Sequence, residues 1–257
     1  MKPQRIGRYL TTDEHGFLLP DVAIENMKSP WREAVDFVTG ALLARGAKAV
    51  YLRGSVPRGL AIEGVSDLDF LYLEGPDAEQ AEEELFAEFE ERFPFVDGLE
   101  LIRFEASTLS QVFPPQTRPY FQMLLKTQSL FLAGRDIARE IAPFKMDVNL
   151  CSHVYTIEKE FAQLSDWLAE ADDEEDLRAT RRWFFRRLVR AGAEICVPRT
   201  GRFTRDLYLC YEDFAQLYPE QGPAMERALE GAVSGLADPL AEGALVAMVG
   251  AERARLG

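Results

Sequence analysis

The feature that most constrains the fold is a pair of short apolar segments, residues 48–53 (KAVYLR) and 67–73 (DLDFLYL), joined by a link that contains glycines. Both segments are rich in valine, leucine and aromatic residues and are too short for a typical helix, so they are predicted to be neighbouring strands. Side chains alternate between the two faces of a strand, which places Asp67 and Asp69 on one face and Leu68 and Phe70 on the other. The sequence therefore predicts two carboxylates that point the same way.

The turn after the first strand complements these carboxylates. Gly54 lets the backbone approach a ligand closely, and backbone amides together with the Ser55 hydroxyl can hold phosphate oxygens. Arg58 can add positive charge to the same loop. Ser66 is also expected at this phosphate site, where it orients the turn before the acids; no base partner that would make it reactive is evident nearby.

The acidic pair itself indicates a metal site. Two carboxylates on one face repel each other unless a cation lies between them. Oxygen ligands of this kind suit Mg²⁺, whose coordination is usually completed by water and by substrate phosphates. Asp67 and Asp69 are therefore predicted to hold one or two Mg²⁺ ions, with substrate phosphates bound beside them.

The flanking segments of the first half alternate between helix and strand patterns. Residues 30–45 are predicted to be a helix with Ser29 as its cap, Pro30 in its first turn and Gly46 after its end. Residues 77–93 repeat apolar side chains at helical spacing, and residues 98–105 (GLELIRFE) form a further predicted strand.

The second half has only helical patterns. They cover residues 154–171, 175–195, 204–218 and 223–236. The predicted fold class is therefore α+β: a mixed β-sheet catalytic domain over residues 1–143, followed by an all-α helical bundle over residues 144–257.

Charge and composition limit the partners. The chain has 29 lysines and arginines against 43 aspartates and glutamates, a net charge of −14, which disfavours nucleic acid and favours a neutral or cationic small molecule. The arginines of residues 178–190 could bind a polyanion, but they are expected to pair with acids just upstream. There is neither an apolar signal core nor a run of about 20 apolar residues, so we expect a cytoplasmic protein with no membrane partner.

The segment GSVPRGLAIEGVSDLD, residues 54–69, resembles the nucleotidyltransferases of the DNA polymerase β type, which have a glycine-serine turn, about a dozen residues and then Asp-x-Asp. It is most similar to the branch that includes minimal nucleotidyltransferases and aminoglycoside adenylyltransferases. The resemblance implies that Asp67 and Asp69 are catalytic and that a third carboxylate comes from a later strand. Glu100, between Leu99 and Leu101, is the best match for that third acid.

Two other residues remain candidates for the third acid. Glu105 is separated from Glu100 by an odd number of residues and is expected to face the opposite side of the strand. Asp147 precedes a helical pattern and suits an N-cap better.

These features together predict an enzyme that transfers a nucleoside monophosphate, most simply AMP from ATP, to an acceptor hydroxyl. The charge favours a small cationic acceptor such as an aminoglycoside. The alternatives are a toxin-type nucleotidyltransferase that modifies transfer RNA or protein, and a non-catalytic, antitoxin-like or regulatory member of the fold.

Overall fold

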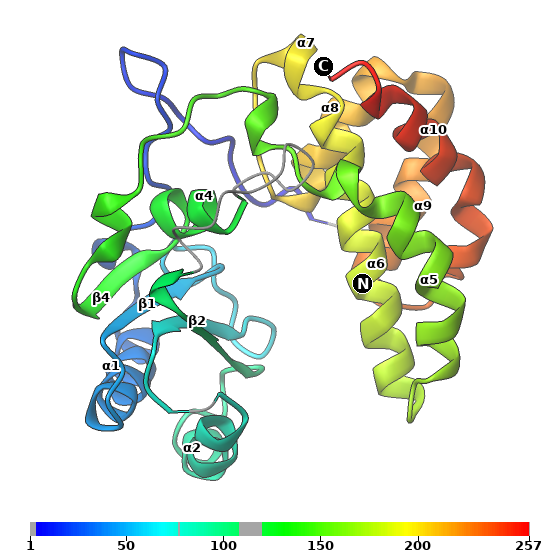
Figure 1. Ribbon diagram of the computed structural model, residues 1–257. Helices are drawn as coiled ribbons and strands as arrows, with labels where there is room; N and C mark the ends of the chain where they lie inside the picture. Colours follow the sequence, from blue (N-terminus) through cyan, green and yellow to red (C-terminus); the bar gives the residue numbers. More distant parts are fainter. Residues whose placement is uncertain (1–3, 77, 108–119, 257) are drawn as a thin grey trace. The chain divides into compact units, whose positions relative to one another are not determined.

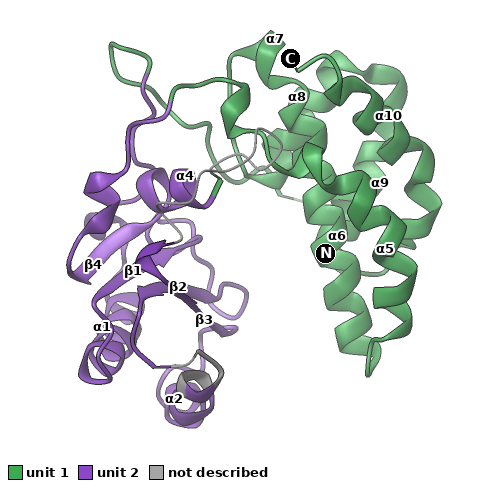
Figure 2. Ribbon diagram, in the orientation of Figure 1, with its two compact units in different colours: residues 1–16, 113–120, 145–257 green, residues 17–112, 121–144 purple. Residues whose placement is uncertain are grey.

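The computed structural model describes residues 4–76, 78–107 and 120–256. The chain divides into two compact units (Figure 2). The sheet unit comprises residues 17–112 and 121–144, and the helical unit comprises residues 1–16, 113–120 and 145–257. Within the described residues, no helix combines the length and the apolar character needed to cross a bilayer.

The sheet unit is built on a four-stranded mixed sheet in the order β3-β2-β1-β4. Its strands are β1 (Ala49–Arg53), β2 (Leu68–Leu73), β3 (Leu99–Phe104) and β4 (Leu130–Gly134). β1 pairs antiparallel with β2 and with β4, while β2 and β3 are parallel. The two predicted neighbouring strands are thus confirmed as β1 and β2, and the mixed sheet agrees with the predicted α+β class.

Apolar packing covers the two faces of this sheet differently. Helices α1 (Ser29–Ala44) and α2 (Ala78–Arg92) lie on one face, where Leu52, Phe70 and Phe89 belong to one large buried cluster (Figure 1). The opposite face carries a smaller buried cluster, which includes Tyr51 and residues of α4 (Tyr120–Thr127) and of the short helix η2 (Ile137–Glu140). Because this second cluster fills only part of its face, polar side chains can occupy the remainder.

Helix α1 begins differently from the prediction. Ser29 is its first residue, Lys28 holds the N-cap position, and no side-chain hydrogen bond caps the helix, so the expected Ser29 cap is wrong. Pro30 lies in the first turn as predicted. Gly46 follows the end with φ of 96°, a conformation that glycine adopts without steric cost, so its predicted role is confirmed.

The helical unit confirms the four helices predicted in the second half. They are α5 (Ile157–Ala169), α6 (Glu174–Glu194), α8 (Leu207–Leu217) and α9 (Gly222–Ser234). The structure adds α7 (Val197–Thr200), α10 (Gly243–Arg253) and the short helices η3 (Val148–Leu150), η4 (His153–Tyr155), η5 (Pro219–Gln221) and η6 (Pro239–Glu242); η1 (Ile24–Asn26) belongs to the sheet unit. Helix α6 is central, since it packs against α5, α8 and α9 and its Phe184 and Phe185 are fully buried.

A buried polar pair joins η4 to the end of α6. His153 Nδ1 lies 2.7 Å from Oε1 of Glu194, and the backbone N–H of Val154 donates to the other carboxylate oxygen at 2.8 Å. Both side chains are almost completely buried, with 4% and 3% exposed. Burial lowers the pKa of His153 below its ordinary value of 6.5, although the Glu194 carboxylate opposes that shift.

This pair predicts a pH dependence of stability. The unfolded chain takes up a proton on His153 near pH 6.5, whereas the folded protein does so only at lower pH, so the unfolded state gains protons first as the pH falls. The free energy of unfolding should therefore decrease as the pH falls from about 7.5 to 5.5. Urea denaturation measures it: His153→Gln should flatten the dependence, and His15→Gln, at an exposed turn, should leave it unchanged. If the free energy of unfolding changed equally with pH in the wild type and in His153→Gln, His153 would not be the source of the dependence.

Candidate active site

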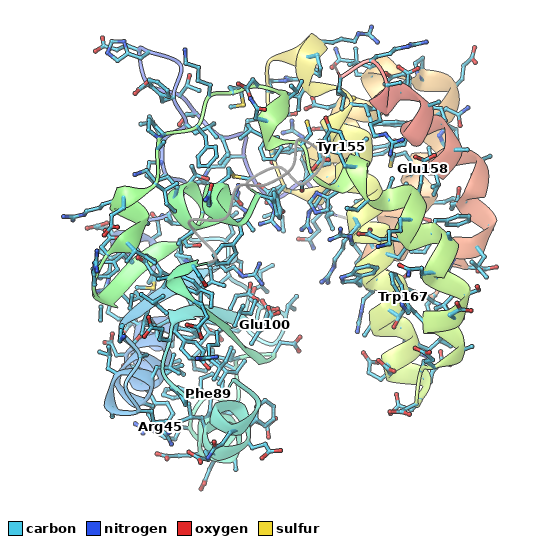
Figure 3. All side chains as sticks on the ribbon, in the orientation of Figure 1. Arg45, Phe89, Glu100, Tyr155, Glu158 and Trp167 are labelled. Atoms are coloured by element: carbon cyan, nitrogen blue, oxygen red, sulfur yellow. The ribbon has the colours of Figure 1, made fainter. Side chains whose placement is uncertain are left out.

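A row of three charged side chains crosses the sheet from β1 to β3. The strand register places Arg53 opposite Asp69, and Asp69 beside Glu100. Arg53 Nη2 lies 2.9 Å from Oε2 of Glu100 and 3.5 Å from Oδ1 of Asp69. Asp69 is largely buried, with 15% of its side chain exposed, whereas Glu100, labelled in Figure 3, is 51% exposed. The strands thus bring one buried and one accessible carboxylate together.

The turn after β1 approaches this row closely. Gly54 has φ of 87°, and a Cβ at this position would lie 2.6 Å from Oδ2 of Asp69. A glycine is therefore needed both for the backbone conformation and for the space. The structure places the predicted turn directly against the predicted acid.

Two buried polar atoms on either side of Gly54 have no hydrogen-bond partner among the described residues. They are the hydroxyl of Ser55 and Nε of Arg53. Buried polar groups are nearly always paired, and those that are not call for an explanation such as a missing ligand. The hydroxyl and the N–H could each donate a hydrogen bond to a phosphate oxygen.

Asp67 lies one residue before β2 and is exposed. Leu68 and Phe70 are fully buried within the cluster on the α1 and α2 side, so the predicted alternation of faces holds for this strand. Asp67 precedes the strand, so the face that it shares with Asp69 stays a prediction. The geometry leaves Asp67 accessible to a ligand from solvent.

Ser66 and Arg58 have structural partners. The backbone N–H of Ile62 donates to Ser66 Oγ at 3.0 Å, which fixes the turn that precedes β2. Arg58 Nε lies 2.6 Å from Oδ2 of Asp21, and both of these side chains are mostly buried. Whether either residue also contacts a nucleotide stays a prediction.

The two other candidates for the third acid lie elsewhere. Glu105 forms an ion pair of 2.5 Å with Arg103. Arg103 is separated from Glu100 by an odd number of positions on β3, so the two side chains point to opposite faces of the strand. Asp147 caps η3 by accepting a hydrogen bond of 2.8 Å from the Asn149 N–H, as an N-cap residue does. Of the three candidates, the structure brings Glu100 beside Asp69.

The chemistry of these donors suits a hard cation. Asp67, Asp69 and Glu100 offer carboxylate oxygens near one end of β2 and β3, the ligand type that Mg²⁺ prefers. Among the described residues, however, no three His, Cys, Asp or Glu side chains are already grouped closely enough to form a metal site. The cationic group that contacts both Asp69 and Glu100 is Arg53.

The arginines of α6 pair within the helical unit. Arg178 contacts Glu174 at 3.2 Å and Arg182 contacts Glu175 at 2.5 Å, as predicted from the acids upstream. Three further arginines of α6 have partners in this unit: Arg187 binds Glu160, Arg186 donates to the carbonyl of Ala232, and Arg190 donates to that of Arg205. Burial, with a contribution from the nearby Arg205, lowers the pKa of Arg190 to about 10. This segment is therefore largely occupied by internal contacts.

Sequence reasoning missed Arg53. Its signal was present, because Arg53 directly precedes the Gly54-Ser55 turn at the end of a predicted strand. Its contact with Asp69 and Glu100 depends on strand register, which residue spacing alone does not give.

Comparisons with known proteins add a distant likeness of fold. No family model matches the sequence, and no curated protein matches it. Among solved structures, the chain is similar to a crystal structure of spectinomycin adenyltransferase AAD(9) from Enterococcus faecialis with ATP and spectinomycin. The two share 16% sequence identity with a TM-score of 0.47, over 88% of this chain and 98% of that chain. At this level the likeness is a distant one of fold and does not show what this chain does.

Proposed function

We propose that this protein is a Mg²⁺-dependent nucleotidyltransferase that moves a nucleoside monophosphate, AMP from ATP, to a hydroxyl group of a small cationic acceptor such as an aminoglycoside. One observation carries this proposal: a glycine-serine turn with an unpaired buried hydroxyl lies against Asp69, which itself lies beside Glu100. The turn suits phosphate and the acids suit a metal ion, which are the two requirements of nucleotidyl transfer.

The turn would hold the triphosphate. The Ser55 hydroxyl, now without a partner, and the backbone amides of the turn would donate to phosphate oxygens, while Gly54 leaves room for the approach. Arg58 would add positive charge from the following loop, where its ion pair with Asp21 holds it. Ser66 would serve the same site by fixing the turn before Asp67.

The acids would prepare the reaction. Asp67 and Asp69 would hold Mg²⁺, which, when bound, neutralises negative charge on the triphosphate. Glu100 would accept the proton of the acceptor hydroxyl as its oxygen forms a bond to the α-phosphorus and pyrophosphate departs. Its half-exposed carboxylate is open to an acceptor that arrives from solvent.

The charge distribution supports a cationic acceptor. The chain carries a net charge of −14, and five of the six arginines of α6 contact acids or carbonyls of their own unit. A long-range field of this sign attracts an amine-bearing molecule and repels RNA.

An acceptor assay tests the proposal. The protein would be incubated with Mg²⁺, α-labelled ATP and either a panel of aminoglycosides or total transfer RNA, at low and moderate salt. We expect label on an aminoglycoside and none on RNA. Label on RNA that falls steeply with rising salt would instead establish the toxin-type alternative. No transfer to any acceptor, with ATP still bound, would favour the regulatory alternative.

Substitutions of Glu100 and Glu105 test which of these two residues is the third acid. Glu100→Gln should lower the turnover number by about a hundredfold while leaving ATP affinity unchanged, because a general base acts in the chemical step. Glu105→Gln should change neither value, since Glu105 pairs with Arg103. Steady-state kinetics with calorimetric ATP titration measures both. A loss of turnover in Glu105→Gln alone would transfer the role to that residue.

A further inference from the structure

Arg53 takes a position between the acids that a metal ion would be expected to take. Its Nη2 contacts both Glu100, at 2.9 Å, and Asp69, at 3.5 Å, and 21% of its side chain is exposed. Two neighbouring carboxylates without a cation would repel each other. The guanidinium therefore allows the row to exist before any metal binds.

We propose that Arg53 is a positioning residue that competes with the metal ion: it holds Asp69 and Glu100 together in the metal-free protein and must release at least one of them when the cation binds. This inference rests on the proposed function, because it assumes that Asp69 is a metal ligand. The inference goes beyond the proposed function because it makes Arg53 a competitor of the metal ion for the same acids.

Three observations indicate that Arg53 competes with the metal ion and is not a permanent structural contact. Arg53 contacts Oδ1 of Asp69 and Oε2 of Glu100, and carboxylate oxygens are the ligand type that a hard cation prefers. Its contact with Asp69 is long at 3.5 Å, so little hydrogen-bond energy is lost when it breaks. Its Nε is buried without a partner among the described residues, so the guanidinium has an unused donor beside the Gly54-Ser55 turn.

The expected consequence is a tighter metal site when the positive charge is removed. Arg53→Gln keeps most of the side-chain length and a polar end but removes the charge that repels the incoming cation. We expect its dissociation constant for Mn²⁺, a probe for Mg²⁺, to fall on the order of tenfold. Arg53→Lys retains the charge and should bind Mn²⁺ as the wild type does. Arg103→Gln, which removes an arginine from the opposite side of β3, is the matched control and should leave the affinity unchanged.

Metal-free stability provides a second readout. In chelator, Arg53→Gln should lower the melting temperature by about 2–4 °C because the variant loses the positive charge that offsets the repulsion between Asp69 and Glu100. Adding Glu100→Gln to Arg53→Gln should recover most of that loss. If Arg53 stabilised the fold only by packing, the double variant would show no such recovery.

The experiment uses the full-length protein, with Mn²⁺ binding followed by electron paramagnetic resonance and unfolding followed by circular dichroism. Tighter Mn²⁺ binding in Arg53→Gln, with Arg53→Lys at the wild-type value, would support the competitor role. Unchanged or weaker binding in folded Arg53→Gln would overturn this inference but leave the proposed function standing. Absence of Mn²⁺ binding in every variant and in the wild type would overturn both.

Discussion

Asp69→Asn is expected to reduce nucleotidyl transfer by about a thousandfold or more, because it removes the buried charge of the proposed metal site. Asp69 lies between Arg53 and Glu100 in the strand register, and its carboxylate contacts Arg53. Asparagine has nearly the same shape, and the fold should survive. Label transfer from ATP, with unfolding monitored in parallel, measures the two effects.

The control for this substitution is Asp36→Asn. Asp36 is an exposed residue of α1, on the side of the sheet opposite the acids, so it should retain full activity. Full activity in a folded Asp69→Asn variant would exclude this carboxylate from the reaction.

Gly54→Ala is expected to weaken ATP binding by about a hundredfold. The new Cβ would lie 2.6 Å from Oδ2 of Asp69, closer than such contacts can be, so either the turn or the acid must shift. The φ of 87° adds about 1–2 kcal/mol of backbone strain for a non-glycine residue. Calorimetric titration with ATP and Mg²⁺ measures the affinity.

Gly64 offers a matched control for that strain. It also has a positive φ, 71°, but a Cβ there would meet no atom within 4 Å. Gly64→Ala should therefore lose about 1 kcal/mol of stability while keeping its ATP affinity. Equal losses of affinity in both variants would mean that loop strain, rather than crowding at Asp69, explains the effect.

Elements with clear punctuation or periodicity were predictable from the sequence. Helix α1 has Pro30 at its start and Gly46 after its end, and β1 and β2 are short apolar runs that bracket a turn. Residues 120–134 carried no prediction, because their apolar runs are too short to separate a helix from a strand by period, and the structure forms α4 followed by β4 there. Helix α10 was missed for a similar reason, since small and apolar residues dominate its sequence.

The geometry of the candidate site was predictable only in part. Alternation predicts a shared face for Asp67 and Asp69, which stays a prediction because Asp67 precedes β2, and odd spacing separated Glu105 from Glu100. The contact of Arg53 with two acids, and the pair of His153 with Glu194, depend on register and packing between residues 16 to 47 positions apart. No local pattern encodes such contacts. The roles of Gly54, Ser55, Arg58 and Ser66 in nucleotide binding remain predictions that only a ligand can test.

The central claim is transfer of the nucleoside monophosphate, and the position of the label tests it most directly. The purified protein would be incubated with Mg²⁺, an aminoglycoside panel and ATP labelled either at the α-phosphate or at the γ-phosphate. We expect the α-label to join the acceptor and the γ-label to appear only in pyrophosphate. Transfer of γ-label to the acceptor, with ADP as the other product, would show a phosphotransferase and contradict the account.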